Sequence, residues 1–487
     1  MSKEDRTQYV LLPTRGITAR AGTPESVAKT LVHAFRAMRH TPQDAPELED
    51  VTVLDSIAED GAKLVEMTPR AMHDLKALQP GLRIIPVVYY RPAWARHVIR
   101  SRVTAANAKV KRTIAFVVKD DQGTAVAGAD IVAFANFKAG DGVEGKTNAQ
   151  GKFSTSLPTS IKTFERIFIY PAKDVWGHLQ GNVKIGAEMT FTLPRVDVAG
   201  YTDGLRAAFP AASPTDGQGV RVAVVDTGVD PHPDLKIAGG LNTVYGEVDT
   251  EYGDAGTGHG THVAGIIAGQ RRGVAPAVEL YSYRVFGKRK DTATNFAIAK
   301  AIERAVQNKC DVINLSLGGG PPDAATAAAI SDARQAGSVV LAAAGNDGRK
   351  PVNFPGADPL AVAVSAVGRK GTFPKTSLEQ GDVAAPYGTD KNDFIAAFSN
   401  IGPEIDITGP GVGIISTVPG LAYGVMGGTS MACPAVAGFL ARLLSRESAL
   451  LAATRDANRA DEILKLLFKS AKSLGFPSNM EGKGLPQ

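Results

Sequence analysis

The chain has 487 residues, of which 44% are hydrophobic and 21% charged, and its 54 basic and 49 acidic side chains leave a net charge of +5. This composition excludes a disordered chain, a collagen-like repeat and a membrane protein, because no run approaches the ~18 apolar residues that span a bilayer. Two cysteines, Cys310 and Cys433, exclude a disulfide scaffold and a cysteine-ligated zinc cluster. At about 150 residues per domain, the length predicts roughly three domains.

Residues 1–100 predict a small α+β domain. Thr23-Pro24 and Thr68-Pro69 each pair a helix cap with a first-turn proline, which indicates the starts of two helices. Four short apolar runs predict strands: Tyr9–Leu12, Val51–Leu54, Lys63–Met67 and Leu82–Tyr90. The resulting order, strand–helix–strand–strand–helix–strand, predicts one sheet with two helices on one face.

The segment from Arg91 to Arg112 concentrates the positive charge, with seven basic and no acidic residues. We interpret it as exposed and solvated, and place a basic linker at residues 101–112; a processing site and a patch for a polyanion are the alternatives. Because exposed linkers between domains are frequently nicked, we also expect cleavage in this segment. The small net charge of the whole chain predicts neither nucleic acid nor a membrane as a partner.

Residues 113–196 predict a small β-sandwich, since short β-rich runs alternate with turn residues. The runs are Thr113–Val118, Ala129–Phe134, Gly151–Ser156, Ile167–Tyr170 and Met189–Leu193. No carboxylate pair stands beside a histidine in this region. We therefore assign no chemistry to it and interpret Trp176 and His178 as structural or surface residues.

Residues 200–487 predict an α/β domain. Apolar strands such as Val222–Val225, Val312–Leu317 and Val339–Ala344 alternate with alanine-rich helices. Continuous apolar strands of this kind are typical of a parallel sheet that is buried on both faces. Three motifs with reactive side chains lie in this region.

The first motif, Val224–Asp230, is an apolar strand that ends in Asp226 and a glycine turn. Open α/β sheets build their sites at such carboxyl ends of strands. An isolated aspartate at this place is often a turn residue or a metal ligand instead.

The second motif, Gly258–Gly265, surrounds His259 with small residues ahead of an apolar helix. Its glycines allow the backbone to pack closely around an imidazole. His259 and His262 could form a metal pair, but no third ligand stands nearby and the glutamate of the zinc-protease helix is missing. We therefore expect no metal at this motif.

The third motif, Gly427–Pro434, places Ser430 at the start of an apolar helix. A serine there is usually only a helix cap. Thr429 can supply the cap instead, which would leave the Ser430 hydroxyl available beside the backbone N–H groups and the positive end of the helix dipole.

Together the motifs present Asp, His and Ser in the chain order of subtilisin, which differs from the orders of chymotrypsin and the α/β-hydrolases. Residues 200–485 thus resemble the subtilisin-like serine proteases (peptidase S8 family), almost letter for letter in the motifs. The resemblance implies a serine endopeptidase in which Ser430 is the nucleophile, His259 the general base and Asp226 its orienting carboxylate. The alternative is an inactive or latent subtilase fold that acts as a binding or targeting protein.

The resemblance also implies the residues that bind substrate. Asn346, in the run Ala342–Gly348, corresponds to the oxyanion-hole donor of the family. The strand that pairs with an extended substrate and the walls of the S1 pocket correspond to Ser316, Leu317, Gly318, Gly319, Ala343, Ala344 and Gly345. Glycine walls without an acidic residue predict a large, uncharged P1 residue. Lys288–Lys290 on the opposite rim is interpreted as a solvated loop, with recognition of acidic substrate residues as the alternative.

Two departures from the family pattern concern a metal site and a loop. Gly269–Gly273 is short and basic where many members carry a calcium-binding loop, and it lacks the oxygen ligands that calcium requires. Asp234 is retained, but we expect no cofactor and no strong calcium site; a weaker calcium site stays open. Residues 369–393 form a longer connection than in the family, and we expect a surface loop.

The N-terminal pattern resembles the ferredoxin-like inhibitory propeptide of this family. It implies a self-inhibited zymogen whose own N-terminal domain is the inhibitor, with Leu82–Tyr90 and the residues after it leading into the active-site cleft. The β-sandwich, whose run Gly145–Phe153 loosely resembles carboxypeptidase regulatory-like domains, separates inhibitor and protease, which is a departure. The N-terminus, MSKEDRTQYV, lacks the apolar core of a secretory signal, so we expect a cytoplasmic chain, with leaderless export or a removed leader as alternatives.

Overall fold

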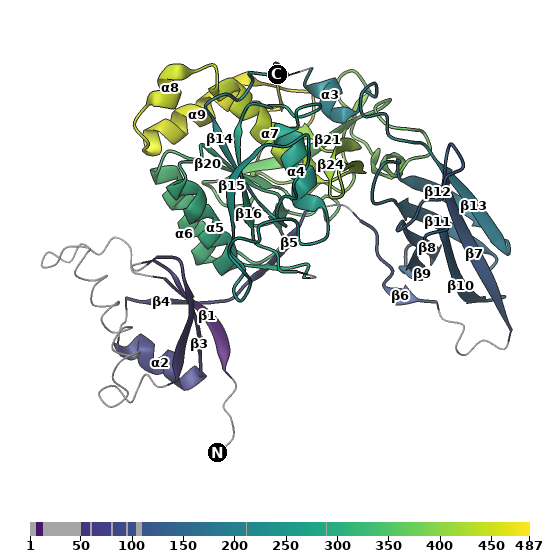
Figure 1. The fold of residues 1–487 in the computed structure, drawn as a ribbon, viewed down its shortest axis with the longest axis horizontal. Coiled ribbons are helices and arrows are strands. Elements are labelled where there is room, and N and C mark those ends of the chain that lie inside the picture. Colours follow the sequence, from purple (N-terminus) through teal and green to yellow (C-terminus); the bar gives the residue numbers. More distant parts are fainter. Residues whose placement is uncertain are drawn as a thin grey trace, which may run out of the picture.

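The computed structural model describes residues 6–12, 50–58, 61–78, 81–93, 96–103, 110–210, 212–288 and 290–487. These residues form three bodies, which we call the N-terminal body (between residues 6 and 88), the β-rich body (between 101 and 196) and the large body (200–487). Figure 1 shows the N-terminal and β-rich bodies apart from each other, each beside the large body. The helix expected after Thr23-Pro24 lies outside the described residues.

The N-terminal body is a four-stranded sheet with a helix on one face. Its strands are β1 (Thr7–Leu12), β2 (Val51–Ser56), β3 (Lys63–Met67) and β4 (Arg83–Pro86). They lie in the order β2-β3-β1-β4, and every neighbouring pair is antiparallel. Helix α2 (Pro69–Leu78) begins directly after Thr68, whose hydroxyl accepts a hydrogen bond of 3.2 Å from the Ala71 N–H, as a cap should. Ala71 and Leu75 pack against Val65 in a small core.

The other face of this sheet packs on the large body. Val10 shares a hydrophobic core with Phe296 of helix α5 (Asn295–Gln307). At the edge of this contact, the Lys300 ammonium lies 2.7 Å from the Asp55 carboxylate. The N-terminal body is therefore docked by both apolar burial and an ion pair.

The single strand expected at Leu82–Tyr90 is two strands, so this prediction was wrong. β4 ends at Pro86, and β5 (Tyr89–Pro92) leaves the sheet to pair with the large body. Apolar residues continue from β4 into the start of β5, so the sequence alone does not reveal where one strand ends and the next begins.

The β-rich body consists of two sheets around an aromatic core. Their orders are β10-β7-β13 and β12-β11-β8-β9-β6. The strands are β6 (Ser101–Arg102), β7 (Lys111–Asp120), β8 (Asp130–Asn136), β9 (Asp141–Lys146), β10 (Lys152–Pro158), β11 (Thr163–Tyr170), β12 (His178–Lys184) and β13 (Glu188–Leu193). Phe116, Phe164 and Phe191 belong to the core between the sheets. Strand β6, which was expected to be linker, pairs with β9.

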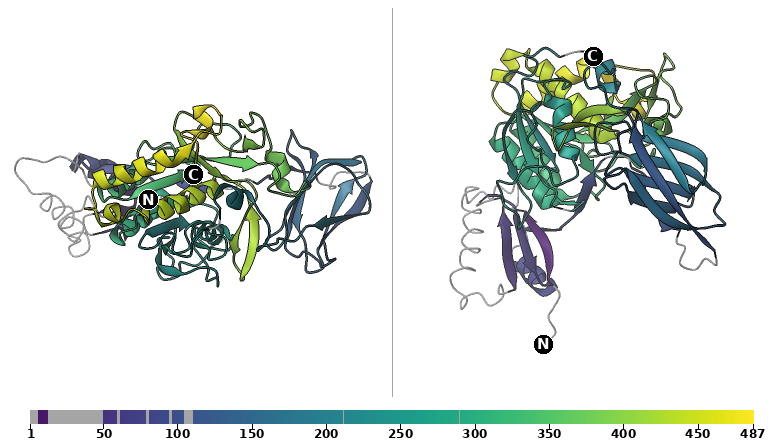
Figure 2. Two further views of the ribbon diagram at one scale, coloured as in Figure 1. Left: turned by 90° about the horizontal axis from the view of Figure 1, so that it is seen from above. Right: turned by 45° about the vertical axis from the view of Figure 1, so that its right-hand side comes forward.

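The large body has a central eight-stranded sheet, which Figure 2 shows from two further directions. The order is β15-β16-β14-β18-β20-β21-β22, with β23 also paired to β21, and all pairs except β21–β22 are parallel. The strands are β14 (Arg221–Asp226), β15 (Ile237–Asn242), β16 (Glu279–Arg284), β18 (Val312–Leu315), β20 (Val339–Ala343), β21 (Val362–Arg369), β22 (Asp393–Ile395) and β23 (Ile405–Pro410).

Helices cover both faces of this sheet. Helices α4 (His259–Ala268) and α7 (Thr429–Leu444) share one core with Val222 of β14, whereas α5 and α6 (Ala324–Gln335) share another core with Ala223. Successive residues of β14 thus point into opposite cores, which confirms the expectation of strands buried on both faces. The shorter elements are α3 (Gly204–Ala208), α8 (Ser448–Ala452), α9 (Ala457–Ser470), α10 (Ser478–Glu481), β17 (Ala293–Thr294), β19 (Leu317–Gly318), β24 (Ile414–Val418), β25 (Ala422–Met426), β26 (Ala471–Lys472), β27 (Leu485–Pro486) and the 3-10 helix η2 (Leu378–Asp382).

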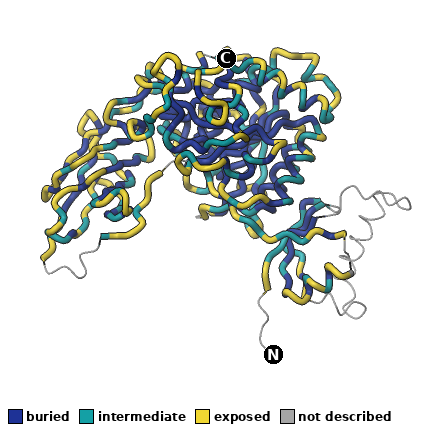
Figure 3. The backbone as a smooth tube through the Cα atoms, turned by 180° about the vertical axis from the view of Figure 1, so that it is seen from behind, coloured by how far each residue is buried: buried dark blue, intermediate teal, exposed yellow. Residues whose placement is uncertain are grey.

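The β-rich body is anchored to the large body by Trp176 and by the connection 369–393. Trp176 is fully buried and belongs to the hydrophobic core of the large body. Leu378 of η2 packs against a cluster that contains Phe168 of the β-rich body, and Glu379 is only 4% exposed. The connection was expected to be a surface loop, and this is wrong for η2, which is part of an interface. Figure 3 shows how the buried segments concentrate in the large body.

None of the helices in the described part of the chain is long and apolar enough to cross a bilayer.

Candidate active site

Asp226 and His259 meet at the carboxyl end of the central sheet. Asp226 is the last residue of β14, and His259 is the first residue of α4. Oδ1 of Asp226 lies 2.7 Å from Nδ1 of His259, and both side chains are fully buried. The helix approaches the strand closely because of Gly260, where a Cβ would lie 2.2 Å from the Gly228 carbonyl oxygen.

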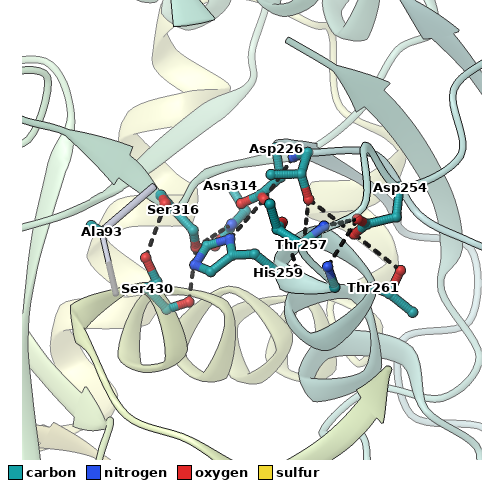
Figure 4. A network of polar contacts seen from close by, with 12 residues as sticks. Ala93, Asp226, Asp254, Thr257, His259, Thr261, Asn314, Ser316 and Ser430 are labelled. Carbon is teal, nitrogen blue, oxygen red and sulfur yellow. Dashed lines mark hydrogen bonds and ion pairs between the residues drawn. The ribbon is translucent and has the colours of Figure 1, made fainter. Parts of the chain in front are cut away.

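A second aspartate, Asp254, holds the two segments together, as Figure 4 shows. Its Oδ2 accepts a hydrogen bond of 3.0 Å from the Thr227 hydroxyl, which in turn accepts the Gly260 N–H at 2.8 Å. Its Oδ1 accepts the backbone N–H groups of residues 256, 257 and 258. Burial raises the pKa of Asp254. Sequence reasoning missed this residue, although an aspartate two residues before a glycine is a recognisable turn signal.

Ser430 lies across from the imidazole at the start of α7. In Figure 4 its hydroxyl faces the ring of His259. The hydroxyl donates a hydrogen bond of 2.9 Å to the Ser316 carbonyl, and the Ser316 hydroxyl donates one of 2.9 Å to the Ser430 carbonyl. The structure thus brings together all three residues that the motifs singled out.

Thr429 does not cap the helix, contrary to expectation. The N-cap of α7 is Gly428, which makes no side-chain cap. The Thr429 hydroxyl instead donates to Oδ1 of Asn346 at 3.0 Å and accepts the Gly345 N–H at 3.1 Å. A polar partner nearby in space has outcompeted the local cap, and such a partner is invisible in the local sequence.

The chain's own strand β5 pairs with the strand that was expected to pair with substrate. It lies between β19 and β17 in a three-stranded antiparallel sheet, with Pro92 opposite Leu317 and Tyr90 opposite Ala293. The N–H of the next residue, Ala93, donates a hydrogen bond of 3.1 Å to the Ser316 carbonyl. The strand Ser316–Gly319, expected to pair with an extended peptide, therefore pairs with one from the same chain.

The carbonyl oxygen of Ala93 accepts two hydrogen bonds at the start of α7. One comes from the Ser430 N–H at 3.2 Å, and the other comes from the side-chain amide of Asn346. The orientation of that amide is fixed, because its own oxygen accepts the Thr429 N–H at 2.9 Å. The carbonyl of Ala93 is thus held between the backbone of Ser430 and the side chain of Asn346.

The other residues that were expected to line the S1 pocket are buried or closely packed. Ala343 and Ala344 are fully buried, and at Gly345 (φ +105°) a Cβ would come within 2.4 Å of the side chains of Asn353 and Asn400. The residue that the chain itself presents here, Ala93, has a small side chain.

Tyr90 occupies a pocket that the sequence did not indicate. Its side chain is fully buried. Its hydroxyl donates to Oδ2 of Asp323 at 2.5 Å, and the hydroxyl oxygen also lies 3.0 Å from the Pro321 carbonyl oxygen. Oδ1 of Asp323 caps α6 and accepts the side-chain amide of Asn295 at 3.2 Å. Burial, followed by the hydrogen bond to Asp323, raises the pKa of Tyr90.

On the opposite rim, Lys288 pairs with Glu251 at 2.5 Å. Arg289, the next residue of the expected basic loop, lies outside the described residues.

No group of three or more His, Cys, Asp or Glu side chains in the described ranges is arranged to hold a metal ion. Oδ1 of Asp234 accepts the Arg271 N–H at 3.0 Å, and burial raises the pKa of Asp234. Burial lowers the pKa of His262 to about 3, and Nε2 of His262 lies 3.0 Å from the Ile414 carbonyl oxygen. His262 is therefore a neutral core residue turned toward the backbone.

Comparisons with known proteins found a matching family and several relatives. The Subtilase family matches residues 217–484. Subtilisin BL and Subtilisin Savinase, both from Lederbergia lenta, are 39% and 38% identical over 274 residues, which is 55% of this chain and 89% of each relative. An alkaline protease from Shouchella clausii is 38% identical over 274 residues, which is 55% of this chain and 63% of that protein.

Proposed function

Because the chain belongs to the subtilase family and is a subtilisin-like serine endopeptidase, we propose that Asp226, His259 and Ser430 are its catalytic triad. Ser430 Oγ attacks the peptide carbonyl while His259 takes its proton. Asp226 holds Nδ1 of the imidazole at 2.7 Å and stabilises the imidazolium. His259 then protonates the leaving amine, and water releases the acyl-enzyme by the same steps. This chemistry requires no cofactor.

Asn346 and the Ser430 N–H form the oxyanion hole in this proposal. The observation that carries the proposal is the Ala93 carbonyl, which accepts hydrogen bonds from both donors directly beside the Ser430 hydroxyl. Preorganised donors of this kind stabilise the charge that develops on the oxygen in the transition state. One of them contributes about 10²–10³ in kcat, the figure known for the asparagine donor of subtilisin.

The N-terminal body is, in this proposal, a ferredoxin-like inhibitory propeptide, and the full chain is a self-inhibited zymogen. The antiparallel order β2-β3-β1-β4 supports this, as do the docking on α5 and the pairing of β5 with β19. The expected cleavage in the segment Arg91–Arg112 is then assigned to the bond between Ala93 and Trp94. The enzyme that remains would begin at Trp94 and keep the β-rich body, a carboxypeptidase-regulatory-like sandwich.

The rival function is an inactive subtilase fold that only binds a partner. A fluorophosphonate probe, which reacts with activated serines, separates the two. We expect the probe to label the purified wild-type chain, with incorporation rising as residues 1–93 are released, and not to label Ser430→Ala. Failure to label the wild-type chain after complete removal of residues 1–93 would overturn the assignment.

A further inference from the structure

A cavity of about 420 Å³ lies between the β-rich body and the large body, next to the proposed triad. Residues 256–258, which directly precede His259, form part of its wall, as do residues 425–427, shortly before Ser430. The β-rich body contributes Asp130, Phe168 and Tyr170, and η2 contributes Glu379 and Asp382. We call this cavity the interdomain pocket. Its size is that of a site for a small ligand or a few side chains.

The chain enters the interdomain pocket shortly after the reacting carbonyl. Arg96 and His97, the third and fourth residues after Ala93, both line it. The Arg96 guanidinium lies 3.2 Å from Oδ2 of Asp130 and 5.0 Å from the centre of the Tyr170 ring. A guanidinium between a carboxylate and an aromatic face is held by charge and by cation–π attraction together.

His97 is held by the same strands. Its ring stacks on Phe168 with the ring centres 4.0 Å apart, and its backbone N–H donates to the Tyr170 hydroxyl at 3.0 Å. Arg96 and His97 are therefore both held by contacts with the β-rich body.

The pocket is also lined by two acidic side chains besides Asp130, namely Glu379 and Asp382. Glu379 is 4% exposed, and its Oε2 finds no hydrogen-bond donor among the described residues. Asp382 lies in the same wall, and burial raises the pKa of both Glu379 and Asp382. Of the two lysines in the lining, Lys146 pairs with Asp130 at 3.3 Å and Lys173 is exposed. A buried carboxylate oxygen without a donor is costly, and a cationic ligand would satisfy it.

We propose that the interdomain pocket is a substrate site that selects an arginine or lysine at the third residue after the scissile bond. This rests on the proposed function, which it extends to the leaving side of the substrate. The β-rich body is then part of the substrate cleft. The alternative is that the pocket binds only the chain's own Arg96 side chain, and the test below distinguishes the two.

Arg96 is in this view an internal occupant that competes with substrate. Cleavage after Ala93 would free the new N-terminus, but β6 still pairs with β9 a few residues further on. Arg96 therefore stays close to the pocket. An external substrate must displace it, so removing the Arg96 side chain should tighten the binding of cationic substrates.

The first experiment measures cleavage by the wild-type chain after its own maturation. Fluorogenic peptides carry Tyr-Tyr-Arg-Pro-Ala before the bond and Trp-Ala-Xaa-His after it, with Arg, Gln or Glu at Xaa. We expect kcat/KM for Arg to exceed that for Glu about tenfold or more, mainly through KM. Asp130→Asn and Glu379→Gln should each shrink this ratio. The matched control is Glu188→Gln, which alters an exposed carboxylate of the β-rich body that contacts Lys152, and it should leave the ratio unchanged.

Arg96→Ala should lower KM for the Arg peptide several-fold and leave the Glu peptide unchanged. Equal kcat/KM for the three peptides, or a ratio that survives both acidic substitutions, would overturn the proposal and leave the pocket as a seat for Arg96 alone.

A binding measurement that needs no catalysis separates this inference from the proposed function. Fluorescence anisotropy follows labelled Trp-Ala-Arg-His binding to the full chain with Arg96→Ala and Ser430→Ala. We expect weaker binding when Glu replaces Arg in the peptide or when Asp130→Asn is added. If this variant shows such binding but the wild-type chain cleaves no peptide, only the triad is contradicted. Cleavage by the wild-type chain without any preference at Xaa would contradict only the pocket.

Discussion

The hydroxyl of Tyr90 donates a hydrogen bond of 2.5 Å to Oδ2 of Asp323, at the end of a pocket that buries the whole tyrosine side chain. The carboxylate cannot turn away, because its other oxygen accepts the N–H groups of Ala325 and Thr326 at the start of α6. Tyr90 lies three residues before Ala93. In the proposed cleavage after Ala93, the Asp323 carboxylate therefore contacts the fourth residue before the scissile bond.

This pairing predicts that the enzyme distinguishes tyrosine from phenylalanine at that position. A peptide with phenylalanine would leave the buried Asp323 oxygen without a donor, which costs about 1–3 kcal/mol and corresponds to a loss in kcat/KM of about 5- to 150-fold. Asp323→Asn keeps an oxygen for the helix cap but changes the acceptor, so the preference should shrink in that variant. Equal cleavage of both peptides by the wild-type enzyme would contradict the prediction.

Asn346 and Thr429 predict a graded loss of catalysis. Asn346→Ala removes an oxyanion donor, so kcat should fall about 10²–10³ with little change in KM. Thr429→Ala removes the hydroxyl that donates to the Asn346 oxygen, and it should lower kcat by a smaller factor. Thr429→Ser, which keeps the hydroxyl, should restore most of the activity. A Thr429→Ala enzyme in which KM changes but kcat does not would show that Thr429 does not position the amide.

The position of Ala93 predicts a defined self-cleavage product. Intact-mass spectrometry and N-terminal sequencing of the purified wild-type chain should show a fragment that begins at Trp94. The same preparation of Ser430→Ala should stay uncut, because the bond is held in place but no nucleophile is present. A fragment that begins elsewhere between Arg91 and Arg112 would show that the reacting carbonyl is not that of Ala93.

The burial of Glu379 predicts that this residue lowers the free energy of unfolding as the pH rises. Burial raises the pKa of Glu379 above its ordinary value of 4.5. Well below pH 4.5 the carboxyl group is protonated in both the folded and the unfolded chain, so its ionisation does not change the free energy of unfolding. As the pH rises, the unfolded chain loses the proton first, so stability falls until the folded pKa has been passed.

Glu379→Gln, in the Ser430→Ala background that prevents digestion, should therefore raise Tm relative to its parent at neutral pH. At pH 4 the two chains should unfold at similar temperatures, and Glu188→Gln serves as the control. A difference that is constant across this pH range would assign the effect to packing and not to ionisation.

The surroundings of Asp234 predict that calcium does not bind at the position of the family's calcium loop and does not change the Tm. Its carboxylate already accepts the Arg271 N–H, and the turn is tight enough that a Cβ on Gly273 would lie 2.3 Å from the Gly269 nitrogen. Melting curves of Ser430→Ala in excess calcium and in excess EDTA should coincide. A higher Tm in calcium would point to a site that this turn does not provide.

The features that could be predicted from the sequence are those that depend on short motifs of neighbouring residues. Asp226, His259 and Ser430 each stand in a short motif that also contains the glycines for close packing, so their approach could be foreseen. The contact of Tyr90 with Asp323 joins residues 233 positions apart, and neither residue stands in a motif. Such pairs depend on how β5 leaves its own sheet, and a continuous apolar run does not reveal that departure.

The errors have the same physical origin. Thr429 and η2 were assigned from their local letters, as a helix cap and as a surface loop. Each found a partner far away in the sequence, Asn346 for Thr429 and the β-rich body for η2. Tertiary contacts can override a local preference of this size, since a single cap contributes only about 1 kcal/mol.

The burial of Trp176 also has a consequence for the modularity of this gene product. The centre of the indole lies 4.9 Å from the centre of the Tyr201 ring, and a Cβ on Gly413 would lie 3.3 Å from the indole. Trp176 is thus inside a core that otherwise belongs to the large body. A shortened enzyme that starts at residue 200 would carry a cavity there, and losing a buried tryptophan typically costs about 3–5 kcal/mol. The β-rich body is thus not a freely exchangeable module, because the core of the large body depends on its Trp176 side chain.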